Sequence, residues 1–183
     1  MIESIIITSL AEARHKPYKE SLKQDVWITA IDPEDETRIR KMSQGFSRKG
    51  ILYFYQFFRD WSDEDPEPFI IQHLETQGPQ EHHIARIIKF IEPLTTDNVP
   101  HHIGINCMAG ISRSTAIGII AWVMQGKTPK EALNEILKVR LQAWPNLRIL
   151  RMASAILGKD LFNPILEWKN EQRGCLVHSS PLE

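Results

Sequence analysis

Two patterns of apolar and polar residues alternate along the chain, and each predicts a different secondary-structure element. Short β-rich apolar runs predict strands, whereas apolar residues recurring every three or four positions predict helices. The expected strands cover residues 3–10, 25–32, 50–58 and 101–106. The expected helices cover residues 33–46, 78–93, 113–124, 129–140, 145–157 and 160–173. Strands dominate the first half and helices the second, and their alternation predicts one α/β domain. We expect this domain to span residues 1–170, with a C-terminal tail at 171–183.

Local signals sharpen some of these expectations. Asp32 fits the N-cap of the first long helix, because a proline follows it at the first helical position. The aromatic run Tyr53–Phe58 lies in a glycine-bounded apolar segment, which predicts a buried central strand whose rings pack in the core. Pro93 is expected to end its helix, and Pro164 to interrupt the last one.

The composition limits the classes of function. With 183 residues, 42% of them apolar, the chain can bury one substantial core. Its 22 basic and 23 acidic residues give a net charge of −1, which argues against a general nucleic-acid or anionic-membrane surface. No apolar stretch approaches the roughly 18 residues of a membrane span, and no basic segment precedes the N-terminal apolar run as in a secretory signal. Two cysteines, Cys107 and Cys175, are too few for a disulfide framework and predict a cytoplasmic location.

The segment INCMAGISRSTA, residues 105–116, places a cysteine and an arginine at the two ends of a loop of small residues. Cys107 follows a predicted strand and Arg113 begins an apolar helix, so loop and helix N–H groups converge where a thiolate or a phosphate is stabilised. Gly110 allows the loop to curl with its N–H groups inward. Arg113 offers a planar fork that matches two phosphate oxygens, and Ser114 can donate a hydrogen bond to the sulfur. These groups together predict nucleophilic attack on a phosphorus atom.

This segment resembles the signature of the cysteine-dependent protein tyrosine and dual-specificity phosphatases, in which cysteine, five residues and arginine precede serine or threonine. The signature here consists of Cys107, Met108, Ala109, Gly110, Ile111, Ser112, Arg113 and Ser114. The segment AGISRSTA, with the apolar helix behind it, resembles the dual-specificity and small bacterial members more than the larger receptor-like ones. The resemblance extends over roughly residues 1–160 and implies a central, mostly parallel sheet with helices on both faces. It further implies Cys107 as nucleophile, residues 108–113 as the phosphate-binding loop, a phosphocysteine intermediate, and neither metal nor cofactor.

The residue before the cysteine and the candidate general acid both bear on this resemblance. The family usually has histidine before the cysteine, where this chain has Asn106. Asparagine can hydrogen-bond similarly but carries no charge, so we expect a working thiolate in a somewhat less favourable environment. Relatives also supply an aspartate, as general acid and later base, from a loop before the signature. The predicted loop 59–69 offers Asp63, then Asp65, then Asp60, in that order of preference, although such acids can also simply solvate a loop.

Smaller signals have ordinary alternatives. Asn146, in the segment AWPNLRIL, resembles a Pro-Asn segment of small bacterial phosphatases and either reaches the rim of the site or caps the following helix. The pairs His82-His83 and His101-His102 suggest a metal site. Adjacent residues point in different directions, however, and no carboxylate or cysteine stands at ligand spacing, so no metal is expected.

The function implied by the resemblance is hydrolysis of phosphomonoesters, chiefly on phosphotyrosine proteins and, with a shallow pocket, on phosphoserine and phosphothreonine. A phosphorylated protein or a small phosphomonoester is the expected partner, and neither nucleic acid nor membrane is expected. One alternative is a pseudophosphatase that binds phosphate without turnover, which Asn106 favours. Another is a phosphatase for phosphoinositides or RNA 5′-phosphates, which ranks lower because residues 108–112 include no lysine or arginine. The sequence does not indicate an oligomeric state.

Overall fold

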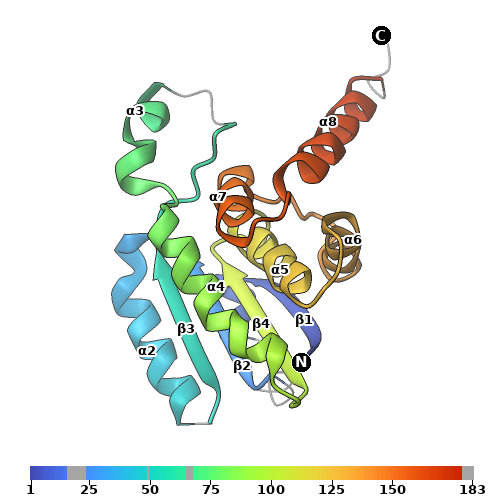
Figure 1. The fold of residues 1–183 in the computed structure, drawn as a ribbon. Coiled ribbons are helices and arrows are strands. Elements are labelled where there is room, and N and C mark those ends of the chain that lie inside the picture. Colours follow the sequence, from blue (N-terminus) through green and yellow to red (C-terminus); the bar gives the residue numbers. More distant parts are fainter. Residues whose placement is uncertain (16–23, 49, 65–67, 179–183) are drawn as a thin grey trace.

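The computed structural model describes residues 1–15, 24–48, 50–64 and 68–178. This part of the chain contains four strands, all parallel, in the spatial order β1-β4-β2-β3. The strands are β1 (Ile2–Ser9), β2 (Val26–Ile31), β3 (Leu52–Phe57) and β4 (His101–Cys107). The helices are α1 (Leu10–His15), α2 (Glu36–Ser47), α3 (Pro68–Gln77), α4 (Glu81–Thr96), α5 (Arg113–Met124), α6 (Pro129–Val139), α7 (Leu147–Leu157) and α8 (Phe162–His178), with a short 3-10 turn at Pro33–Asp35. The predicted α/β fold with a parallel sheet is confirmed (Figure 1).

Helices cover both faces of the sheet, and the alternation of side chains along β2 shows how. Val26, Ile28 and Ala30 belong to the main core, which α4, α5, α6, α7 and the start of α8 complete. Trp27 and Ile31 point to the opposite face and pack against α1 and α2. A parallel sheet buried on both faces needs apolar residues at successive positions, and all of β2 is accordingly buried.

The aromatic strand β3 lies at one edge of the sheet, so the prediction of a central strand is wrong. Its rings are mostly half-buried and pack on both faces. Tyr53 stacks on Phe46 of α2 with ring centroids 5.1 Å apart, and Phe54 stacks on Phe90 of α4 at 4.5 Å. The aromatic run therefore does contribute to core packing, because large rings from neighbouring helices cover the edge strand.

Two prolines that were expected to break helices lie inside them. Pro93 occupies the last turn of α4, which continues to Thr96, and at this position proline removes only one hydrogen bond. Pro164 lies in the first turn of α8, where a backbone N–H has no partner within the helix. Helix α8 continues to His178, into the segment 171–183 that was expected to form a C-terminal tail. None of the helices in the described ranges is long and apolar enough to cross a membrane.

Candidate active site

The loop after β4 carries the signature and occupies the position that the sequence predicts. Cys107 is the last residue of β4, and Arg113 is the first residue of α5. Gly110 has a φ of 71°, a left-handed conformation that side chains other than glycine rarely adopt. A Cβ atom at Gly110 would lie 2.6 Å from the carbonyl carbon of Thr8. Glycine is therefore required both for the turn and for its close packing against the end of β1.

The carbonyl groups in the first half of the loop are bound from outside. The backbone N–H of Leu10 donates to the carbonyl oxygen of Met108 at 3.1 Å. The guanidinium of Arg140, which follows α6, donates to the carbonyl oxygens of Ala109 at 2.7 Å and of Gly110 at 3.1 Å. These donors hold three successive carbonyl groups away from the centre of the loop.

The carbonyl groups in the second half are bound in the same way. Ile111 accepts from the backbone N–H of Trp144 at 2.9 Å and from the hydroxyl of Thr115 at 2.5 Å. Ser112 accepts from the backbone N–H of Asn146 at 3.3 Å and also from Thr115 at 2.9 Å. The peptide N–H points opposite to the preceding carbonyl, so outward carbonyls leave the N–H groups of this loop on its inner side.

The inner N–H groups form a cradle for an anion. The amide of Gly110 donates to the Cys107 sulfur at 3.2 Å. The amides of Ala109, Ile111 and Ser112 donate no hydrogen bond to any described part of the chain. Successive unpaired N–H groups around a turn at a helix N-terminus bind anions such as phosphate.

The Cys107 sulfur lies at the base of this cradle. Its side chain is fully buried, with 0% of its surface exposed. The hydroxyl of Ser114 lies 3.2 Å from the sulfur, as the signature implies. A serine hydroxyl and a backbone amide at this distance stabilise a negatively charged sulfur.

The guanidinium of Arg113 is held through its Nη1 atom, and its Nε atom has no hydrogen-bond partner among the described residues. Its Nη1 atom donates to the carbonyl oxygen of Phe58 at 2.5 Å and to Asp32 Oδ1 at 3.1 Å. The Nε atom is buried. Asp60 Oδ2 lies 3.7 Å from this Nε atom, which is too far for a hydrogen bond. A buried arginine N–H without a partner is costly, and an oxyanion in the cradle would satisfy it.

Asp32 occupies the predicted N-cap position with Pro33 after it, although the element it precedes is the short 3-10 turn before α2. Its side chain makes no capping hydrogen bond and binds Arg113 instead. Asp32 directly follows β2, at the same edge of the sheet at which β4 ends, so its position along the strand could have indicated this contact.

Of the candidate acids Asp60 and Asp63, Asp60 contacts the signature loop. Its Oδ1 atom accepts a hydrogen bond from the Ser112 hydroxyl at 2.7 Å and from Asn146 Nδ2 at 3.1 Å. Asn146 also caps α7, since its Oδ1 accepts from the N–H of Ile149 at 3.1 Å. The capping role predicted for Asn146 is therefore confirmed, and the same side chain also contacts Asp60 beside the signature loop.

Asp63, the preferred candidate for the general acid, faces a different part of the molecule. Its carboxylate binds Arg148 at 3.0 Å and Arg151 at 2.8 Å, both on α7. Asp65 lies outside the described residues. The structure thus brings Asp60, third in the order of preference, to the loop and engages Asp63 elsewhere.

The histidine pairs lie in packing and ion-pair environments. The His83 ring stacks on Phe58 with centroids 5.1 Å apart, and burial together with the neighbouring His82 lowers the pKa of His83 to about 4. His101 lies between the carboxylates of Asp25 and Asp97. In the described ranges, no three histidine, cysteine or carboxylate side chains gather as a metal ion requires.

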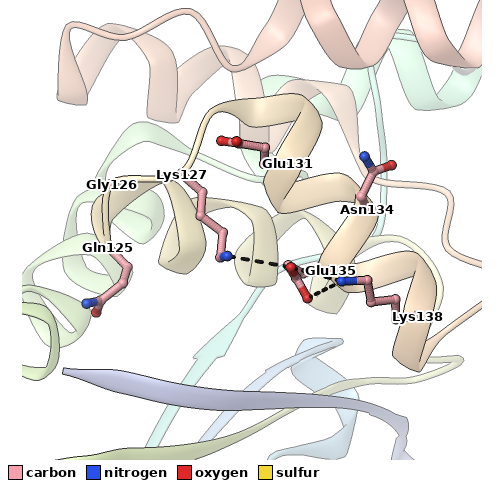
Figure 2. A pocket seen from close by; sticks show the side chains of 7 residues that line it. All are labelled: Gln125, Gly126, Lys127, Glu131, Asn134, Glu135 and Lys138. Atoms are coloured by element: carbon pink, nitrogen blue, oxygen red, sulfur yellow. Dashed lines mark hydrogen bonds and ion pairs between the residues drawn. The ribbon is translucent and has the colours of Figure 1, made fainter.

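A surface pocket lies beside the turn from α5 to α6 (Figure 2). No residue of the signature loop lines it. Its charged groups pair with one another, since Glu135 binds both Lys127 at 3.5 Å and Lys138 at 3.1 Å. The two lysines of its lining are thus already paired, and we assign the pocket no ligand.

Comparison with solved structures identifies the fold. A crystal structure of PTPMT1 matches with a TM-score of 0.54 and 17% sequence identity, covering 92% of this chain and 95% of that one. Human DUSP28 matches with a TM-score of 0.52 and 15% identity, over 84% of this chain and 94% of that one. The Yvh1 phosphatase domain from Chaetomium thermophilum matches with a TM-score of 0.52 and 18% identity, over 84% and 91%. No protein-family model and no curated protein matches the chain. The chain therefore has the fold of the dual-specificity-type cysteine phosphatases, as its signature predicted.

Proposed function

We propose that this protein hydrolyses phosphomonoesters through a phosphocysteine intermediate formed on Cys107. One observation carries the proposal: every carbonyl group of residues 108–112 is bound from outside, so the loop amides face inward, and that of Gly110 donates to the sulfur. Arg113 adds a buried Nε atom that has no hydrogen-bond partner among the described residues. Amide groups and a guanidinium fixed before the substrate arrives stabilise the charge that develops on the phosphoryl oxygens, and no metal is needed for this.

Asp60 is the proposed general acid, in place of Asp63. A phosphate that binds Arg113 Nε must come close to Asp60, because the two side chains are only 3.7 Å apart. A carboxyl group at this position can give a proton to the oxygen of a leaving group. The hydrogen bonds from Ser112 and Asn146 hold this carboxyl group beside the loop.

The reaction has two steps. The Cys107 thiolate attacks phosphorus, the phosphorus–oxygen bond to the leaving group breaks, and Asp60 gives its proton to the departing oxygen. Asp60 then removes a proton from water, the water oxygen attacks phosphorus, and the sulfur–phosphorus bond breaks to release inorganic phosphate. Ser114, 3.2 Å from the sulfur, stabilises the thiolate as it leaves.

The favoured substrates are phosphotyrosine proteins, with phosphoserine and phosphothreonine proteins next. PTPMT1, one of the neighbours in fold, has been crystallised in complex with PI(5)P, so phosphoinositides remain the alternative substrate class. Such a lipid carries a phosphodiester in addition to its phosphomonoester. Residues 108–112 carry no basic side chain to bind this second phosphate group, and this favours a substrate with a single phosphate.

The test is hydrolysis of p-nitrophenyl phosphate by the wild-type protein and by Cys107→Ser. We expect turnover that vanadate inhibits and that Cys107→Ser abolishes. Phosphotyrosine peptides and PI(5)P vesicles, assayed in parallel by phosphate release, then distinguish the two substrate classes. Phosphopeptide binding without turnover in the wild-type protein would instead establish a pseudophosphatase, and the full burial of Cys107 is the observation that favours this second candidate.

A further inference from the structure

Arg140 binds the outer side of the signature loop, although it lies 33 residues beyond Cys107 and outside the signature. Its Nη2 atom donates to the carbonyl of Ala109 and its Nε atom to the carbonyl of Gly110. Its Nη1 atom donates to both carboxylate oxygens of Glu12 in α1, at 3.1 and 3.0 Å. One guanidinium therefore connects the end of α6, the start of α1 and the loop.

Glu12 is itself fixed by the chain segment that borders the loop. Its Oε2 accepts from the backbone N–H of Ser9 at 2.7 Å, and its own N–H donates to the Ser9 hydroxyl at 3.1 Å. This reciprocal arrangement is a capping box at the start of α1. The hydrogen bond from the Ser9 backbone, assisted by those from the Ser9 hydroxyl and Arg140, lowers the pKa of Glu12 despite its partial burial. Ser9 pairs with Cys107 in the register of β1 and β4.

We propose that Arg140 and Glu12 are positioning residues for the phosphate-binding loop, and this inference rests on the function proposed above. Arg140 keeps the carbonyls of Ala109 and Gly110 outward, and this orientation turns the amides of Gly110 and Ile111 toward the sulfur. Without the guanidinium, these two carbonyl oxygens lose their donors and either face water or rotate inward. Inward carbonyl oxygens would repel a phosphate and a thiolate.

The planar shape of the guanidinium is essential to this role. Two adjacent carbonyls and one carboxylate lie around its plane, and each of its three nitrogen atoms serves a different partner group. Lysine has the same charge but offers a single nitrogen atom at the end of a flexible stem. It can bind Glu12 or one carbonyl, and it cannot hold both peptide planes in this geometry. Glu12 fixes the orientation of the guanidinium, because both of its carboxylate oxygens accept from Nη1. The contact is partly shielded from water, since the Arg140 side chain is 16% exposed and that of Glu12 is 35% exposed.

The test compares Arg140→Ala, Arg140→Lys and Glu12→Gln with the matched control Lys138→Ala. Lys138 lies on α6, two residues before Arg140, and its replacement removes an exposed ion pair with Glu135. Three quantities are measured: kcat/KM for p-nitrophenyl phosphate, the dissociation constant of vanadate by calorimetry, and the pH midpoint of Cys107 alkylation by iodoacetamide. We expect Arg140→Ala to weaken vanadate binding and kcat/KM by about 10²-fold, the size of effect seen when an oxyanion donor is lost. The alkylation midpoint should also rise.

Arg140→Lys should recover only part of the lost vanadate affinity and kcat/KM. For Glu12→Gln, both quantities should lie between those of the wild type and of Arg140→Ala. Lys138→Ala should match the wild type in both. Vanadate binding and alkylation do not require turnover, so they test the loop even if the wild-type protein hydrolyses nothing. The inference is overturned if Arg140→Lys restores vanadate binding completely, because charge alone would then suffice. It is equally overturned if Arg140→Ala lowers the thermal stability but leaves vanadate binding and the alkylation midpoint unchanged.

Discussion

Trp27 and Asn106 meet across two neighbouring strands, where the indole Nε1 donates to Asn106 Oδ1 at 2.6 Å. The indole reaches this position because it lies over Gly104, where a Cβ atom would be 2.1 Å from the ring. The Thr29 hydroxyl donates to the same oxygen at 2.7 Å, and Tyr53 donates to Thr29 at 2.9 Å. Burial raises the pKa of Tyr53, so this chain of donors is neutral. The carbonyl oxygen of Asn106 thus accepts two buried donors, which the single acceptor nitrogen of a neutral histidine at this position could not do.

Asn106→His should consequently destabilise the protein, although histidine is the residue that the resemblance leads one to expect. A neutral imidazole offers one acceptor nitrogen, so either Trp27 or Thr29 loses its partner at a fully buried position. A buried donor without a partner costs about 1–3 kcal/mol. We expect urea unfolding to show a loss of this size.

The control is a double-mutant cycle with Trp27→Phe, which removes one of the two donors. In the Asn106→His background this second change should cost less than it does in the wild type, because histidine then has only one donor to satisfy. Strictly additive free energies would contradict the explanation.

Asp60→Asn should impair turnover far more than Asp63→Asn, the same substitution three residues along. Removing a general acid typically costs 10²–10⁴-fold in rate. The loss should be greater with phenyl phosphate than with p-nitrophenyl phosphate, since the poorer leaving group needs the proton more. Asp63→Asn breaks contacts with Arg148 and Arg151 and should lower the melting temperature while kcat stays near the wild-type value. Reversal of this order would restore Asp63 as the acid.

Gly110→Ala and Gly158→Ala separate backbone strain from steric contact. Both glycines are left-handed, with φ of 71° and 63°, but a Cβ at Gly158 meets nothing within 4 Å. Gly158→Ala should therefore cost only the left-handed strain, about 1–2 kcal/mol. Gly110→Ala adds a collision with the backbone of Thr8, so denaturant unfolding should show a larger loss, and vanadate binding should fail. Equal losses of unfolding free energy in the two variants would mean that the end of β1 moves to make room for the new methyl group.

The signature loop could be predicted from the sequence because Cys107, Gly110 and Arg113 are contiguous, and strand, glycine and helix are local signals. Its supporting residues could not, because they come from separate elements that meet only in the folded sheet. Nothing near Arg140 in the sequence indicates that its side chain reaches Ala109 and Gly110.

The choice of acid shows the same limit. The sequence favours Asp63, but two arginines on α7 engage it, and no local pattern reveals them. A better signal was available, since Asp60 lies nearest to the end of a predicted strand, and parallel strands end at one edge. Helix α1 was missed as well, although Ser9 and Glu12 have the spacing of a capping box.

His101 gives the fold a pH-dependent contact at the opposite end of β4 from the site. Its Nδ1 lies 2.5 Å from Asp25 Oδ2, and its Nε2 lies 2.8 Å from Asp97 Oδ2. Burial alone would lower the pKa of His101, but the two carboxylates outweigh it and raise the pKa above the ordinary 6.5. The hydrogen bond from His101, followed by that from the N-terminal ammonium, lowers the pKa of Asp97 from 3.8 to about 2.

The sign of the resulting pH dependence follows from linkage. A raised histidine pKa contributes stability that is complete below pH 6.5 and is lost as the pH rises through the folded-state value. The lowered pKa of Asp97 contributes stability above pH 3.8 that is lost as the pH falls toward 2. His101→Gln should therefore destabilise most between about pH 4 and 6.5, and the difference from wild type should shrink toward pH 9. Urea unfolding of both proteins across this range measures it, and a difference that is constant with pH would show that His101 contributes packing alone.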